Sequence, residues 1–104
     1  MSVLVEFAMF PTDKGESVSA YVSRIIKVID ESGVTYKLTP MGTVYETETM
    51  DEALSVLKRS YEVLEQDCNR IYSTVKFDIR KNRSNRMKQK IASIESKLGK
   101  EVSK

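Results

Sequence analysis

Four stretches of the chain alternate apolar and polar side chains with the two-residue period of a β-strand. They span residues 2–10, 34–38, 42–48 and 70–80. Other stretches carry apolar residues at three- and four-residue spacing, which predicts helices between Ser17 and Gly33, from Thr49 to Cys68, and from near Ser84 to Gly99. The order predicts an α+β fold: a ferredoxin-like βαββαβ sandwich with an additional C-terminal helix, in one domain over residues 1–104.

Residues at the predicted helix ends have the side chains that helix termini need. Ser17 is placed to cap the first helix, and Gly33 to end it. The sequence TMDE at the start of the second helix forms a capping box, in which Thr49 and Glu52 each accept a hydrogen bond from a free backbone N–H. The buried side of this helix is expected to contain Leu54, Leu57, Tyr61, Leu64 and Cys68.

The last predicted helix has a narrow apolar stripe. It consists of Met87, Ile91, Ile94 and Leu98. A stripe of this width indicates contact along one edge, so we expect it to dock the helix on the rest of the domain.

In the ferredoxin-like order, two helices cover one face of the sheet and leave the other face open. A strand order of 4-1-3-2 places Lys76 near Glu6 and Lys37 near Glu46 on the open face. Tyr45 is expected on or near this polar side. Apolar residues also lie among the charges, namely Leu4, Ala8, Phe10 and Tyr72. A second copy of the chain would remove their apolar area from water.

Composition excludes several kinds of site. The chain has one cysteine, Cys68, and no histidine, so a disulfide framework and the usual zinc ligand sets are absent. Gly-rich phosphate loops and the common nucleophile motifs are also missing, and we assign no reaction. Glu6 interrupts the apolar region that a signal peptide would need, and no apolar run is long enough to span a membrane, so we expect a cytoplasmic protein.

Charge is distributed unevenly along the chain. Residues 1–79 contain 8 Lys or Arg and 13 Asp or Glu, a net charge of −5, whereas residues 80–104 contain 9 and 2, a net charge of +7. The basic tail is either the solvated face of a helix or an RNA-binding surface. The sheet sequence YSTVKFDI lacks the glycine and aromatic spacing of the RNA-recognition module, which argues against nucleic acid.

The segment LTPMGTVYETE joins two strands without the Asn-Gly or Asp-Gly pair of a tight hairpin. Together with SVSAYV in the first helix and RIYSTVKFDIR in the last strand, it resembles the small single-domain relatives of the YkoF thiamine-binding proteins. The MGT sequence followed by Glu46 carries most of this likeness. Family members often have glycine at the position of Pro40 and a second acidic residue at the position of Ile79.

The resemblance implies a binding protein for thiamine or its hydroxymethylpyrimidine moiety, with no catalysis and no cofactor. Gly42 permits a bend that re-aims the side chains after it. Ser19 and Thr43 are then expected to hydrogen-bond the pyrimidine, and Glu46 to accept from its amino group or to offset the thiazolium charge. Asp78 is a further candidate.

Met9 and Tyr45 are expected to form the walls of this ligand site, because a thioether or an aromatic ring packs well against a flat heterocycle. The resemblance also implies assembly as a dimer of dimers, because members of the family resemble one another in this respect. We therefore expect a homotetramer that buries the open sheet face and leaves the helices outside.

Overall fold

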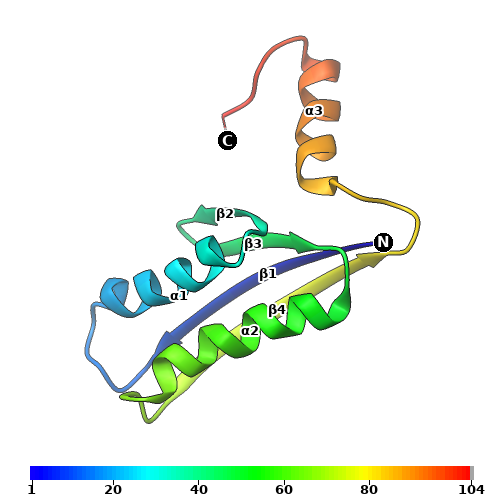
Figure 1. Ribbon diagram of the computed structural model, residues 1–104. Helices are drawn as coiled ribbons and strands as arrows, with labels where there is room; N and C mark the ends of the chain where they lie inside the picture. The colour runs from blue at the N-terminus through cyan, green and yellow to red at the C-terminus, as the bar shows by residue number, and fades with distance from the viewer. Residues whose placement is uncertain (104) are drawn as a thin grey trace.

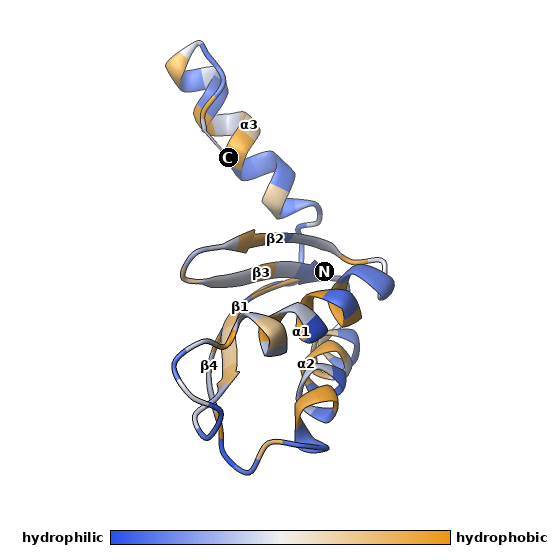
Figure 2. Ribbon diagram, turned by 90° about the vertical axis from the view of Figure 1, so that its left-hand side faces the viewer, coloured by the Kyte–Doolittle hydropathy of each residue, from blue (hydrophilic) through white to orange (hydrophobic). Residues whose placement is uncertain are grey.

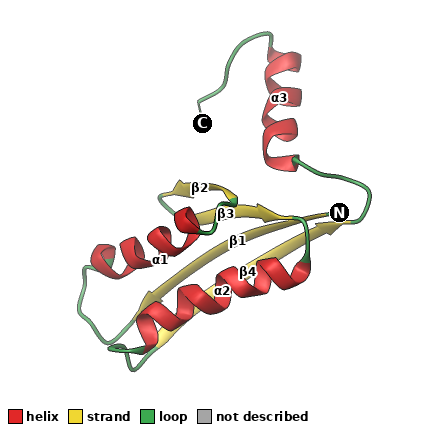
Figure 3. Cartoon of the chain, in the orientation of Figure 1, coloured by secondary structure: helices red, strands yellow, loops and turns green. Residues whose placement is uncertain are grey.

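The computed structural model describes residues 1–103, and it confirms the predicted order of elements (Figure 1). The strands are β1 (Ser2–Pro11), β2 (Thr35–Thr39), β3 (Gly42–Thr47) and β4 (Ile71–Arg80). The helices are α1 (Ser19–Glu31), α2 (Met50–Glu65) and α3 (Arg86–Leu98) (Figure 3). The fold is the ferredoxin-like α+β arrangement with an extra C-terminal helix.

The four strands form one antiparallel sheet in the order β2-β3-β1-β4, as predicted. Helices α1 and α2 cover one face, and α3 lies on the other side (Figure 2). The expected pair of Lys76 and Glu6 is confirmed, with Nζ 3.5 Å from Oε1. The register places Lys37 opposite Val44 and Glu46 opposite Thr35, so Lys37 and Glu46 are diagonal neighbours on the open face and not a directly opposed pair.

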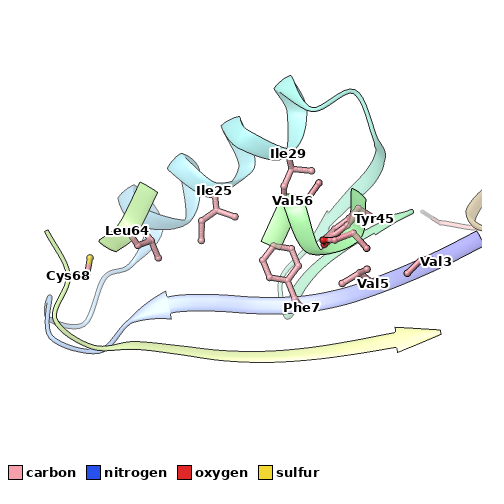
Figure 4. Close-up of a cluster of buried hydrophobic side chains, with 10 residues drawn as sticks. Val3, Val5, Phe7, Ile25, Ile29, Tyr45, Val56, Leu64 and Cys68 are labelled. Atoms are coloured by element: carbon pink, nitrogen blue, oxygen red, sulfur yellow. The ribbon is translucent and has the colours of Figure 1, made fainter. Parts of the chain in front are cut away.

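The core lies between the sheet and the two covering helices (Figure 4). Val3 and Val5 of β1 are fully buried there. Tyr45 of β3 is also fully buried, and its ring meets the Phe7 ring edge to face, with centroids 5.7 Å apart. The prediction that Tyr45 lies on the polar side is therefore wrong. Since neighbouring strand residues point to opposite faces, only one of Tyr45 and Glu46 can face the helices.

Helix α2 presents a side to the core that matches the prediction only in part. Its buried residues are Ala53, Val56, Ser60 and Leu64. Leu54 and Tyr61 are 47% and 42% exposed, so their predicted burial is wrong, whereas the predicted burial of Leu64 and of Cys68 is confirmed. Leu57 is half-buried and packs against the core. Small side chains at positions 53 and 60 allow the helix to approach its neighbours closely, and that contact decides which side faces inward.

Two helix starts differ in how well the sequence predicted them. The Thr49 hydroxyl accepts from the Glu52 backbone N–H at 3.1 Å, which confirms Thr49 as the cap of α2. In α1 the capping residue is Val18 with no side-chain bond, so the Ser17 prediction is wrong. The Ser17 hydroxyl lies 3.5 Å from that of Ser19 instead.

Helix α3 projects away from the sheet (Figure 1). Ile94 and Leu98 of its apolar stripe are 47% and 57% exposed, so the prediction that the stripe docks the helix is wrong. The helix is attached through its first turn, where Arg86 is buried. None of the helices within residues 1–103 is long and apolar enough to cross a membrane.

The Tyr45 hydroxyl donates a buried hydrogen bond of 2.7 Å to the Ala53 carbonyl. We expect Tyr45→Phe to lower the free energy of unfolding by about 0.5–1.5 kcal/mol, because the substitution removes that bond and little apolar area. Urea denaturation measures the change. Tyr72→Phe, at a ring that is 53% exposed, is the matched control and should change the free energy by much less. Equal effects of the two substitutions would contradict the structural role of the Tyr45 hydroxyl.

Candidate functional site

The β2-β3 hairpin is a tight turn in which Thr39 pairs with Gly42, and Pro40 and Met41 form the loop. The Thr39 hydroxyl donates to the Gly42 carbonyl at 2.8 Å and accepts from the Met41 N–H at 3.3 Å. The Thr39 side chain thus stabilises a turn that lacks the usual Asn-Gly pair.

Gly42 is required by a close approach to the neighbouring strand. A Cβ atom at this position would lie 2.8 Å from the Phe7 carbonyl oxygen, which is closer than carbon and oxygen can pack. The absence of a side chain therefore lets the hairpin lie tightly against β1.

A pocket of about 220 Å³ lies between this hairpin, the start of α1 and the end of β1. Its walls are mainly apolar and include Met9, Val22 and Met41. Thr43 also lines it, and this hydroxyl has no hydrogen-bond partner within residues 1–103. The pocket therefore combines thioether walls with one free hydroxyl, which suits a flat heterocycle with polar ring atoms.

The structure brings together two of the six predicted contact residues, Met9 and Thr43. Ser19 is exposed in the first turn of α1, next in sequence to Val18 of the pocket wall. Tyr45 lies beneath, in the core, and does not line the pocket.

Glu46 and Asp78 are on the open side of the sheet, beside the start of α3. Both carboxylate oxygens of Glu46 are in use. Oε2 accepts from the Ser2 hydroxyl and, at 2.9 Å, from the Arg86 backbone N–H, while Oε1 accepts from the Met87 N–H at 3.1 Å. Glu46 thus satisfies two of the free N–H groups at the start of α3, a position where negative charge is favourable.

Arg86 completes the attachment of α3. Its Nε donates to the Ser2 hydroxyl at 2.9 Å, and its Nη2 donates to the carbonyls of Ser2 and Asp78. Nη1 forms an ion pair of 2.9 Å with the Asp78 carboxylate. We call Ser2, Glu46, Asp78 and Arg86 the helix anchor.

The start of α3 has no side-chain cap of its own. Asn85 precedes α3 in a left-handed conformation and forms no side-chain cap, so the helix needs acceptors from elsewhere in the chain. Sequence reasoning missed Arg86, because its partners are up to 84 residues away. Among the described residues, no three cysteine or acidic side chains gather as possible metal ligands.

Burial of Glu46 would by itself raise the pKa of its carboxyl, but the hydrogen bonds from Ser2, Arg86 and Met87 outweigh it. The pKa of Glu46 is therefore below its usual value of 4.5. A carboxyl with a lowered pKa stabilises the folded state above its unfolded pKa, and this stability is lost as pH falls through the folded value.

Comparison with known proteins adds the family. The family model described as thiamine-binding protein matches residues 5–95. The chain belongs to the thiamine-binding protein family. A UPF0045 protein of Mycobacterium bovis is 35% identical over 98 residues, which cover 94% of this chain and 96% of that protein.

Solved structures of similar proteins share the fold of this thiamine-binding protein family member. The crystal structure of a hypothetical protein from Methanocaldococcus jannaschii has a TM-score of 0.80 and 33% identity, covering 89% of this chain and 95% of that one. A domain of unknown function from Bacillus cereus has a TM-score of 0.72 and 25% identity, with coverage of 85% and 86%. The family match includes both the hairpin pocket and most of α3.

We expect Glu46→Gln to loosen the first turn of α3, because the neutral amide cannot accept as strongly from two N–H groups. The docking free energy of the helix should fall by about 1.5–3 kcal/mol. Amide hydrogen exchange at Arg86 and Met87 measures this. Glu48→Gln, two residues along the chain, should leave both amides protected.

In the unchanged protein, protection of the same two amides should fall as pH decreases below about 4.5, the usual value of the Glu46 pKa. NMR measurements of amide exchange at stepwise lower pH follow this loss of protection. The same fall of protection with pH in Glu46→Gln would contradict the assignment of this pH dependence to the Glu46 carboxylate.

Proposed function

We propose that this protein binds the hydroxymethylpyrimidine moiety of thiamine in the hairpin pocket, without catalysing a reaction on it. The observation that carries the proposal is the pocket itself, a small apolar space with the free Thr43 hydroxyl, in a chain of the thiamine-binding family. An aminopyrimidine has a flat apolar face and polar ring nitrogens, which match these two features.

The volume of the pocket favours one ring over two. Sites for drug-sized ligands usually measure about 300–1,000 Å³, and this pocket measures about 220 Å³. A single pyrimidine ring suits this space better than the complete vitamin. In bound thiamine, the thiazolium ring would then extend out of the pocket into solvent.

The absence of charged side chains from the described lining of the pocket also favours the pyrimidine ring over the thiazolium. No acidic or basic side chain is among the described residues that line it, so it offers no counter-charge to a thiazolium. Glu46, the carboxylate first assigned to that role, has both oxygens occupied by the helix anchor. The pocket therefore matches a neutral ring held by a hydroxyl donor or acceptor and thioether walls.

We expect Thr43→Val to weaken binding of hydroxymethylpyrimidine about tenfold, because it removes one hydrogen bond while preserving the shape of the side chain. Isothermal titration calorimetry measures the affinity. Thr35→Val, on the exposed edge strand and outside the pocket, is the matched control and should bind like the unchanged protein.

Absence of heat from the unchanged protein with both hydroxymethylpyrimidine and thiamine would refute the proposed ligand. Conversion of either compound during prolonged incubation would show an enzyme instead of a binding protein. Equal affinities of the two threonine variants would place the ligand elsewhere.

We also propose that the chain assembles as a dimer of dimers through the sheet, with α1 and α2 outside. Apolar side chains of the edge strand β4 support this, because α1 and α2 leave them uncovered. Val75, Phe77 and Ile79 are 37%, 39% and 47% exposed. On the opposite face, Phe10 and Tyr72 form a further apolar pair, with ring centroids 6.0 Å apart. Exposed apolar area of this extent on one strand is typical of an interface.

We expect light scattering to give a tetrameric mass, and Phe10→Asp to lower it by placing a charge in the buried sheet face. Leu54→Asp changes a similarly apolar residue that is 47% exposed on α2, outside the proposed interface, and should leave the mass unchanged. Circular dichroism confirms that both variants fold. A monomeric mass for the unchanged protein at micromolar concentration would refute the assembly.

A further inference from the structure

A second hollow lies on the opposite side of the sheet from the hairpin pocket, between the inner side of α3, the start of β1 and the end of β4. Its volume is about 380 Å³. Five cationic residues line it, namely Arg80, Arg83, Arg86, Lys90 and Lys97. No acidic residue is among the described residues of its lining. We call this hollow the basic cleft.

Only one of the five cations is neutralised. Arg86 is paired with Asp78 and belongs to the helix anchor. Within residues 1–103, the ion pairs are those of Arg24, Lys76 and Arg86, so the other four cations of the cleft have no carboxylate within 4.0 Å. Like charges on the walls of one concavity raise the local positive potential, which an anion would relieve.

Helix α3 presents three of the five cations in a row, and Arg80 and Arg83 precede the helix in the chain. Residues 86, 90, 93 and 97 follow one another at spacings of three and four, so they share one face of α3. The helix anchor holds the first turn of this face against the sheet. Gln89 and Ser93 add an amide and a hydroxyl to the same wall, and both are uncharged donors.

We propose that the basic cleft binds a compact polyphosphate group, as free pyrophosphate or as a di- or triphosphate ester. Arginine and lysine are the usual partners of phosphate oxygens, and arginine can hold two oxygens at once. Several phosphates in one ligand match the four unpaired cations. The inference does not depend on the proposed function, because the basic cleft and the hairpin pocket share no lining residue.

The shape and lining of the cleft favour a compact anion over single-stranded RNA. Proteins that bind single strands combine a long basic groove with aromatic side chains on which bases stack. The basic cleft has no aromatic residue among its described lining residues. Leu4 and Ile94 supply its apolar surface instead.

Calorimetric titration of the full chain with inorganic pyrophosphate tests the proposal. We expect saturable binding, and a loss of affinity of about tenfold or more in the double variant Arg83→Gln with Lys90→Gln, since each charged hydrogen bond contributes strongly. The matched control is Lys88→Gln with Lys100→Gln, which removes the same charge from the same region but outside the cleft lining. The control should lose much less affinity.

Parallel titrations with a nucleoside diphosphate separate a free anion from an ester, and tighter binding of either one supports the cleft. An equal loss in both double variants would overturn the proposal, because it would show a general effect of surface charge. Absence of heat from pyrophosphate and from the nucleoside diphosphate would also overturn it. Tighter binding of a short RNA that displaces pyrophosphate would overturn it in favour of a nucleic-acid surface.

Discussion

The close approach of Gly42 to the Phe7 carbonyl is the constraint on which the arrangement of both candidate sites depends. It sets β3 against β1 in the register that pairs Phe7 with Thr43 and Val5 with Tyr45. A slip by one residue would turn every side chain of β3 to the opposite face of the sheet. The buried hydrogen bond from Tyr45 to Ala53 opposes such a slip, because it exists in one register only.

Alternation along β3 gives its two faces different roles. Thr43 faces the helices and reaches the hairpin pocket, whereas Glu46 faces the other way and receives the start of α3. The helix has no cap of its own, so its attachment depends on the sheet being correctly formed. The position of the basic cleft depends on that attachment in turn. In this way, a contact between backbones in the hairpin also determines where the cations of the tail lie.

The sequence predicted the fold well because strand alternation and helix spacing are local patterns, and Val3, Val5 and Phe7 of β1 are buried on the predicted face. The prediction failed where contacts between distant parts of the chain determine which side chains are buried and which partners they bind. Ala53 and Ser60 face inward on α2 although neither is strongly apolar, since the space available favours small side chains. Of the candidate site, Met9 and Thr43 were found, but the use of Glu46 was not, because Arg86 and Met87 lie 40 and 41 residues away.

The central claim is that the hairpin pocket and the helix anchor are separate sites on opposite faces of the sheet. NMR titration of the labelled protein with hydroxymethylpyrimidine tests this directly through the backbone amide shifts. The account predicts saturable shifts at Met9, Met41 and Thr43, with Glu46 and Arg86 unaffected. Shifts centred on Glu46 and Arg86, with the hairpin unchanged, would contradict it.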